Sequence, residues 1–356
     1  VQSSFYIGRG DCMTSENKKS HLSRRAFLGA SAVGLGAAAI GGSDGFVRKA
    51  FAQSTSSTPR VIKLAWGQTA VCQSPISVAL KKGLFEKYGL TVEPVNFSGP
   101  TDQLLQAIAT GKADGGIGMA LRWLKPLEQG FDVSLTVGTH GGCMRLLAAP
   151  DSGINSIADL KGKKVAVSDQ ASPIRNFFAI QAAKQGINPD TEIEWLQYPA
   201  DLFAEALKKG EVQAVAGDDP HAFLQRERDG LKEVATNLDG QYVNSACCVL
   251  GLRGSLVRDE PEVASALSRA IVEAQAWTAA HPDESAEIFA PFVPGNVSAT
   301  DVARILRSHT HDHHSTGDAL RKDVALFVDE LKIINVIRPN TNTDAFAEKI
   351  VANVIT

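Results

Sequence analysis

From residue 60 onward, short runs of β-branched and other apolar residues alternate with segments whose apolar positions recur at helical spacing. Runs such as 61–66 and 115–119 predict strands, and periodic segments such as 75–88 and 173–185 predict helices. This alternation is typical of α/β proteins. Roughly 300 residues are involved, which is too many for one hydrophobic core of average size. We therefore expect two lobes, each a mainly parallel sheet flanked by helices.

The boundaries of the lobes follow from the order of these elements. The alternation begins afresh near Gly142, and a predicted strand at 248–252 returns the chain to the first lobe. We therefore expect a discontinuous lobe 1, formed by 60–143 and 249–356, and a lobe 2 formed by 144–248. A cleft is expected between them.

The first 52 residues have the pattern of an N-terminal extension and an export signal. Paired arginines within Ser23–Leu28 precede an uncharged stretch at 26–43, and Ala50–Ala52 has the small-x-small pattern of a cleavage site. The arginine pair matches the twin-arginine address. A membrane anchor is the alternative, but the apolar run is rich in glycine and gives way to Asp44. We expect a periplasmic protein, exported by the twin-arginine pathway and not inserted in the membrane after cleavage.

Charge and cysteine content limit the classes of partner. The net charge of −3, with acidic and basic residues interspersed, offers no polycationic field for nucleic acid or an anionic membrane surface. A monomer is expected. Of the five cysteines, Cys12 leaves with the signal, and the other four face an oxidising compartment, where their spacing alone does not determine pairing.

Five segments spread along the chain carry a resemblance to a known family: Ala79–Leu90, Leu105–Gly116, Ile157–Val167, Ala204–Ala216 and Phe327–Ile337. They resemble the nitrate/sulfonate/taurine-type solute-binding proteins of ABC importers, a group that also includes bicarbonate and thiamine-precursor binders. These are packing, turn and capping positions, so they specify the scaffold strongly and the ligand weakly. The resemblance implies a two-lobed type II periplasmic-binding-protein fold, a lobe-closing hinge and the permease subunits of an ABC transporter as partner.

Candidate ligand contacts lie in the loops that follow the predicted strands. Open α/β sheets bind ligands at the carboxyl ends of their strands, where helix N-termini point inward. Each loop also has the ordinary interpretation of a helix cap. The candidate ligand-binding residues are Trp66, Gln68, Thr69, Cys72, Ser98, Gly99, Met119, Trp123, His140, Cys143, Gln170, Ser172, Asp218, His221 and Cys247.

Histidine and cysteine gather at these strand ends. Thiolate and imidazole together suit zinc, copper or iron, and a crevice can collect them from distant positions. The alternative is that the cysteines act as small apolar residues and the histidines as polar walls of the cleft, which the lack of a close Cys-x-x-Cys spacing favours.

A second group of histidines lies near the C-terminal helices. On a helix His309 and His313 are four residues apart on one face, which is a metal-chelating spacing, and the candidate metal ligands are His309, His311, His313 and His314. A solvated His-rich linker is the alternative. A transition metal (zinc, copper or iron) is thus the one cofactor that the sequence suggests.

The leading hypothesis is a binding protein that delivers a small oxyanion, such as nitrate, bicarbonate or a sulfonate, to an ABC importer. Such a ligand would need backbone amides and one cation, for which Arg122, Arg145 and Arg175 are candidates. The alternatives are a metal-containing or pyrimidine-precursor-binding member, or an enzyme, since the same fold resembles iron-dependent pyrimidine synthases that use a His and clustered cysteines. No catalytic residues are assigned.

Overall fold

The computed structural model describes residues 60–97, 99, 101–293, 297–309, 311 and 314–355. These residues belong to one compact unit. The predicted export signal lies outside the described residues. Among the described residues, no helix combines the length and apolar character that crossing a membrane requires.

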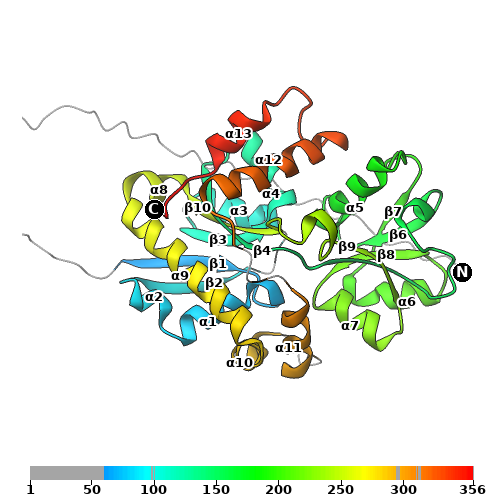
Figure 1. The fold of residues 1–356 in the computed structure, drawn as a ribbon, viewed down its shortest axis with the longest axis horizontal. Coiled ribbons are helices and arrows are strands. Elements are labelled where there is room, and N and C mark those ends of the chain that lie inside the picture. The colour runs from blue at the N-terminus through cyan, green and yellow to red at the C-terminus, as the bar shows by residue number, and fades with distance from the viewer. Residues whose placement is uncertain are drawn as a thin grey trace, which may run out of the picture. The chain divides into compact units, whose positions relative to one another are not determined.

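The first sheet is built from the two ends of the described chain. Its strands are β1 (Val61–Trp66), β2 (Thr91–Asn96), β3 (Gly115–Met119), β4 (Val133–His140) and β10 (Cys248–Arg253), in the order β2–β1–β3–β10–β4 (Figure 1). β1 pairs in parallel with β2 and β3, whereas β10 runs antiparallel to β3 and β4. The expected mainly parallel sheet is confirmed, since β10 alone among its five strands runs against the others. The chain leaves the sheet from the end of β4 and re-enters beside it, so the returning strand must run the opposite way.

The second sheet has the same kind of mixed topology. Its strands are β5 (Met144–Ala148), β6 (Lys164–Val167), β7 (Glu194–Gln197), β8 (Ala214–Asp218) and β9 (Lys232–Thr236), in the order β7–β6–β8–β5–β9. β6 is parallel to β7 and β8, and β5 is antiparallel to β8 and β9. The sequence did not predict β9, because its five residues are all only half-buried and show no apolar alternation.

Helices cover both faces of each sheet (Figure 1). One face of the first sheet carries α1 (Ser74–Lys81), α2 (Leu84–Lys87), α9 (Pro261–Ala280) and α10 (Pro282–Phe289), and the other carries α3 (Thr101–Ala109), α4 (Ala120–Glu128), α12 (Gly317–Ile333) and α13 (Thr343–Ile350). The second sheet lies between α5 (Pro173–Lys184) on one side and α6 (Phe203–Lys208) with α7 (His221–Arg228) on the other. The remaining helices are α8 (Gly254–Asp259), which follows β10, and α11 (Ala299–Ser308), which packs on α10. The α/β class with sheets flanked by helices is confirmed.

One predicted helix is interrupted. The expected helix at 75–88 is two helices, α1 and α2, separated at Gly83, whose φ is +65°. Glycine adopts this left-handed conformation without the steric cost that a Cβ imposes, so it ends α1 and starts the chain in a new direction.

Two short crossings join the sheets, and they are hydrogen-bonded to one another. Residues 141–143 lead from β4 to β5, and residues 237–247 lead from β9 back to β10. The buried Asn237 side chain accepts hydrogen bonds from the amides of Cys143 (3.0 Å) and Met144 (2.8 Å). The Cys247 amide donates to the His140 carbonyl at 2.7 Å. The crossings therefore form a single hydrogen-bonded unit that fixes the strand ends beside it.

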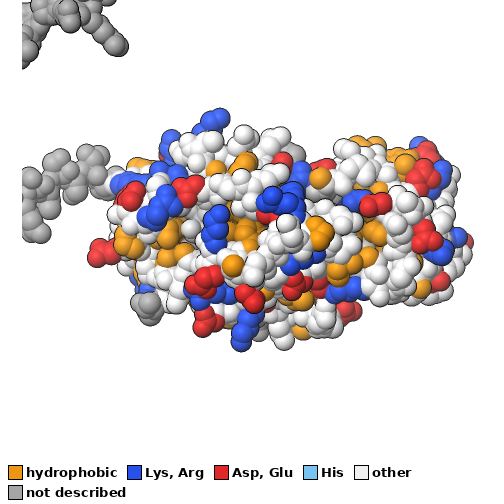
Figure 2. Space-filling view, turned by 90° about the horizontal axis from the view of Figure 1, so that it is seen from above, with side chains coloured by type: hydrophobic (Ala, Val, Ile, Leu, Met, Phe, Trp, Pro, Cys, Tyr) orange, Lys and Arg blue, Asp and Glu red, His pale blue; other side chains and the backbone are white. Residues whose placement is uncertain are grey.

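The surface carries charges of both signs. On the face shown in Figure 2, lysine and arginine side chains are interspersed with aspartate and glutamate. This face offers no extended field of one sign for a polyanionic or polycationic partner.

The segment after α12 is anchored to α4 by one carboxylate. The Glu128 side chain is 3% exposed and lies 2.8 Å from Lys125 Nζ. Its Oε1 accepts a hydrogen bond from the Arg338 amide (3.1 Å) and another from the Thr341 hydroxyl. Burial alone would raise the pKa of Glu128, but hydrogen bonds from Lys125, Thr341 and Arg338 outweigh it and lower the pKa from 4.5 to about 2.

We expect Glu128→Gln to lower the free energy of unfolding at pH 7 by about 1 to 3 kcal/mol, because it removes hydrogen bonds to a charged acceptor. The pKa of the wild-type carboxyl is lower in the folded protein than in the unfolded chain. Its stabilisation is therefore complete above about pH 4.5 and is lost as the pH falls towards about 2. Urea titrations at pH 7 and pH 3 should show a smaller loss on acidification for the variant. Glu348→Gln is the control, since Glu348 is 68% exposed, and equal pH dependence in all three proteins would contradict the assignment.

Candidate functional site

A cavity of about 250 Å³ lies between the two sheets, at the carboxyl ends of their strands. It is named here the cleft. Its lining from the first sheet and the loops that follow its strands is Gly67, Thr69, Ala70, Cys72, Gln73, Phe97, Gly99, Leu104, Met119 and Cys248, and its lining from the second is Ser168, Ser172, Pro173, Ile174 and Asp218. Both lobes thus contribute to one small site.

The polar lining is positioned by local turns. In the loop after β1, Gln73 Oε1 accepts a hydrogen bond from the Gly67 amide at 2.8 Å, which folds the loop back on itself. In the second lobe Ser172 is the N-cap of α5, where its Oγ accepts from the Arg175 amide (3.1 Å), and Pro173 occupies the first helical turn. The Ser172 hydroxyl hydrogen remains available to a ligand because the cap uses only the oxygen.

Six of the predicted ligand contacts line the cleft. They are Thr69, Cys72, Gly99, Met119, Ser172 and Asp218. Another, Ser98, lies outside the described residues. Others that line it were not predicted, among them Gln73, Ser168 and Cys248, although all three lie within two residues of a predicted contact or of a strand end. Which of two neighbouring residues faces a cleft depends on the twist of the strand end, which the sequence does not show.

The two tryptophans among the predicted ligand contacts are instead part of the core. Trp66 is 2% exposed and packs edge-on against Phe292, with ring centroids 5.1 Å apart. Trp123 is fully buried under the first sheet, so close that a Cβ on Gly118 would lie 2.2 Å from its ring. Neither side chain lines the cleft. Burying these large apolar rings in the core removes more of their surface from water than a place in the cleft wall would.

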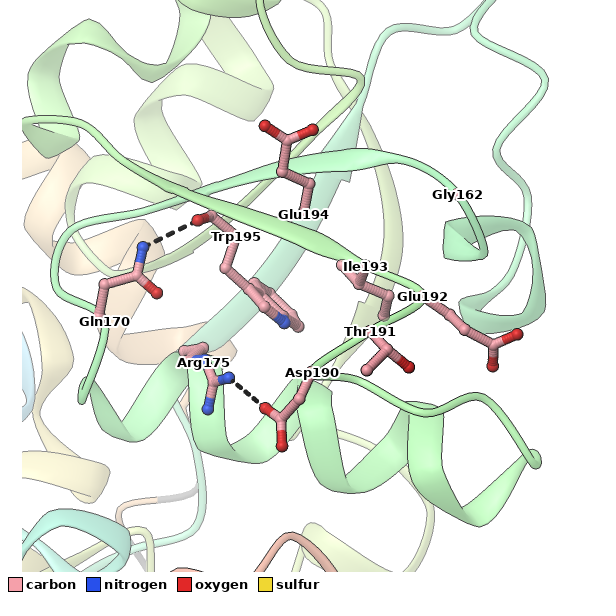
Figure 3. A pocket seen from close by; sticks show the side chains of 9 residues that line it. All are labelled: Gly162, Gln170, Arg175, Asp190, Thr191, Glu192, Ile193, Glu194 and Trp195. Carbon is pink, nitrogen blue, oxygen red and sulfur yellow. Dashed lines mark hydrogen bonds and ion pairs between the residues drawn. The ribbon is translucent and has the colours of Figure 1, made fainter.

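Three further candidates lie apart from the cleft. Gln68 is half-buried without lining it, and His221 is the exposed first residue of α7. Gln170 lines a separate cavity of about 540 Å³ beside β7, where its Nε2 donates to the Trp195 carbonyl at 2.8 Å (Figure 3). The lining of this outer pocket is Gly162, Gln170, Arg175, Asp190, Thr191, Glu192, Ile193, Glu194 and Trp195.

The three candidate cations are all held by carboxylates. Arg175 pairs with Asp190 at 2.8 Å in the outer pocket (Figure 3). Arg145 is buried and pairs with Asp219 (2.9 Å) and Glu233. Arg122 of α4 pairs with Asp102 of its own lobe (2.9 Å) and Asp169 of the other lobe (2.8 Å). Arg122 therefore bridges the lobes, and none of the three is among the described residues that line the cleft.

Four cysteines meet at the floor of the cleft. This cysteine cluster consists of Cys72, Cys143, Cys247 and Cys248. All four are buried, none forms a disulfide, and Cys72 and Cys248 reach the cleft surface. The sequence left open whether the cysteines come together, as in a metal site, or lie apart as small apolar residues. In the structure they come together.

The thiols of the cluster polarise one another. Hydrogen bonds from Cys143 and Cys248 hold the pKa of Cys72 well below its usual value, and hydrogen bonds from the same two thiols lower the pKa of Cys247 in the same way. The pKa values of Cys143 and Cys248 are correspondingly raised. The thiolate form is therefore favoured at Cys72 and Cys247 within this buried group.

His140 completes this group. It is fully buried, its Nδ1 lies 3.2 Å from the Gly142 carbonyl, and its Nε2 has no hydrogen-bond partner. Burial disfavours the imidazolium, but the negative charges of Cys72 and Cys247, with hydrogen bonds to Cys72 and the Gly142 carbonyl, together outweigh it and raise the pKa of His140 to about 9.

Asp218 adds a carboxyl at the lobe 2 side of the cleft. It is the last residue of β8 and half-buried. Burial together with the neighbouring charges of Cys72 and Asp219 raises its pKa to about 7. A carboxyl that is partly protonated near neutral pH can donate a hydrogen bond as well as accept one.

Two of the predicted metal-binding histidines pack behind His140. The rings of His309 and His311 lie 5.8 Å and 5.7 Å from the His140 ring, centroid to centroid. His309 Nε2 lies 2.8 Å from Asp219 Oδ2, and His311 Nδ1 lies 3.1 Å from Gln275 Oε1. His314 is half-buried, and His313 lies outside the described residues. Among the described residues, close triads of metal-binding atoms include His140 but none of these histidines.

Comparison with known proteins agrees with this geometry. Residues 73–285 match the family model described as NMT1/THI5 like. A putative binding protein of Brucella abortus is 27% identical over 219 residues, which cover 61% of this chain and 66% of that protein. The chain thus spans just under two thirds of that relative's length.

Two solved structures have the same fold. The periplasmic aliphatic sulphonate-binding protein SsuA of Escherichia coli matches with a TM-score of 0.69 and 19% identity, over 84% of this chain and 94% of that one. The periplasmic nitrate-binding protein NrtA of Synechocystis matches with a TM-score of 0.66 and 16% identity, over 83% and 86%. The type II periplasmic-binding-protein fold implied by the resemblance is confirmed, and the chain belongs to the NMT1/THI5-like family.

Proposed function

We propose that this protein captures a small oxyanion in the periplasm, of the nitrate, bicarbonate or sulfonate type, and delivers it to the permease of an ABC importer. The observation that carries the proposal is the cleft itself, a cavity of about 250 Å³ that two lobes build jointly at their strand ends. Export by the twin-arginine route and action as a monomer belong to the same proposal. The sulfonate- and nitrate-binding proteins of the same fold support the class of ligand.

The donors of the cleft suit an anion of this size. Thr69, Ser168 and Ser172 supply hydroxyl groups from both lobes, and Gln73 supplies an amide whose oxygen is already bonded to Gly67. The Gln73 nitrogen therefore remains as a donor. The N-terminus of α5 adds the positive end of a 12-residue helix behind Ser172.

Binding would act by shifting the equilibrium between open and closed lobes. A ligand that touches Thr69 in one lobe and Ser172 in the other stabilises the closed arrangement, in which those two surfaces are together. The closed form then presents a surface to the permease that the open form lacks. We infer binding without chemical change of the ligand, as is the role of the named relatives.

We expect nitrate, bicarbonate or a short alkanesulfonate to raise the melting temperature of the protein, because a ligand at 100 times its Kd stabilises the folded state by about 2.7 kcal/mol. Thr69→Val, which removes one hydroxyl at nearly constant shape, should weaken the binding of that anion about tenfold, as measured by titration calorimetry. A pyrimidine is included in the screen as the alternative ligand.

Thr191→Val is the matched control, since Thr191 is an exposed threonine of the outer pocket. Affinity that falls for Thr191→Val and not for Thr69→Val would move the site to the outer pocket. Stabilisation by the pyrimidine alone would replace the oxyanion by the alternative ligand class.

Arg122 is expected to hold the lobes together at the edge of the cleft. Its guanidinium donates to the Ala171 carbonyl of the other lobe and pairs with Asp169 at 2.8 Å, and its side chain is 14% exposed. Arg122→Ala should disfavour the closed form by about 1 kcal/mol, roughly a fivefold change in population. Small-angle scattering of ligand-free protein should then give a larger radius of gyration. Arg175→Ala removes an arginine paired within one lobe and should leave the radius unchanged; equal radii for both variants and wild type would refute this role.

A further inference from the structure

We propose that the cysteine cluster and His140 form a buried binding site for one thiophilic metal ion of the zinc class, at the floor of the cleft. The site draws its donors from the loop after β1 and from both crossings, so no single sequence motif announces it.

The first support is the spacing of the donor atoms. Cys72, His140 and Cys248 place their donor atoms within 4.8 Å of one another. His140, Cys143 and Cys247 do the same, so the two triads share the imidazole. Tetrahedral zinc with Zn–S bonds near 2.3 Å requires sulfur atoms about 3.8 Å apart, so the donors need to approach by only about 1 Å at most.

The second support is the environment of His140. Its Nδ1 faces the Gly142 carbonyl at 3.2 Å, while its Nε2 is buried and unpartnered. A hydrogen bond from one ring nitrogen to a backbone carbonyl is how metal-binding histidines are oriented, and it leaves the other nitrogen as the donor to the ion. A buried polar atom without a partner carries a free-energy cost that an ion would remove.

The surroundings are rigid and accessible. The Cys247 amide donates to the His140 carbonyl, and the Cys143 amide donates to the Asn237 side chain. The Cys143 carbonyl accepts from the Asp219 amide. Backbone bonds of this kind hold donor atoms in place before the ion arrives. Because Cys72 lines the cleft, an ion can reach the site from it.

The donor set selects the kind of ion. Soft thiolates favour zinc, copper(I) and iron–sulfur centres over magnesium or calcium. The close approach of the donor atoms fits a single ion, whereas an iron–sulfur cluster interposes sulfides and needs its thiolates farther apart. A tetrahedral ion takes four of these five donors. The thiols that bind it become thiolates and the imidazole binds as the neutral base, so the displaced protons pass to solvent.

The ion would also change the charge of the cleft. The charged side chain among the described residues that line the cleft is the carboxyl of Asp218. A divalent ion beneath Cys72 and Cys248 would offset two thiolate charges at the floor of the cleft, which would lessen the repulsion that an oxyanion meets there. This consequence rests on the proposed function, whereas metal binding itself is measured without any anion, so the two can fail separately.

The test uses the full chain, purified without an affinity tag under reducing conditions and then given zinc or cobalt(II). Native mass spectrometry and elemental analysis should find one metal ion per chain. Cobalt should give the ligand-field bands of a tetrahedral ion with an intense thiolate-to-cobalt charge-transfer band. Zinc affinity is measured by competition with a chromophoric chelator. The double variant Cys143→Ser with Cys247→Ser, and separately His140→Gln, should each bind zinc at least about tenfold more weakly. Loss of a residue that only supports a metal ligand already costs about that much.

A matched control should bind zinc as the wild type does. His281→Gln changes an exposed histidine whose ring stacks on Trp277. If the cluster variants do not fold, the wild-type cobalt spectrum decides. Failure of reduced wild type to bind stoichiometric zinc or cobalt would overturn the proposal, as would a cobalt spectrum without thiolate charge transfer or a metal-free protein whose cluster is closed by disulfides.

Discussion

The structure depends on the hydrogen-bonded contact between its two chain crossings. Asn237 on the returning segment accepts from Cys143 and Met144 on the outgoing one, and Cys247 donates to His140. This contact holds the start of β10 beside the end of β4, and β10 runs antiparallel to both of its neighbours. It also brings residues about 100 positions apart to the same point, where the carboxyl ends of both sheets face the cleft.

The unusual chemistry of the protein lies at this same point. His140 and Cys143 flank one crossing, and Cys247 and Cys248 end the other, so each residue is placed by the backbone bonds that join the crossings. A metal ion held there would link the first-lobe loop at Cys72 to both crossings. The floor of the cleft and the crossings between the lobes would then be held by the same ion, which connects the proposed metal site to the proposed transport role.

Ion pairs between distant segments, some of them fully buried, add to this hydrogen-bonded contact. Arg122 bridges to Asp169, and Asp219 of the second lobe contacts both Arg145 and His309. Hydrogen bonds from His309 and Arg145 hold the pKa of Asp219 below its ordinary value although burial alone would raise it. The arginines that a sequence analysis would offer to an anion are thus used to hold protein segments together, and the cleft is left with hydroxyl and amide donors.

The sequence by itself determined the α/β class, most strands and helices, several loops that line the cleft, and the family, because each depends on local periodicity or on short contiguous segments. Thr69, Met119 and Ser172 could be predicted as cleft residues because each lies beside the end of a predicted strand or the start of a helix. Only the tertiary structure decided that Trp66 and Trp123 belong to the core, that the arginines are paired, and that four cysteines and His140 meet. Those outcomes depend on which distant segments the two crossings bring together, and pairing across such distances leaves no periodic signal in the chain.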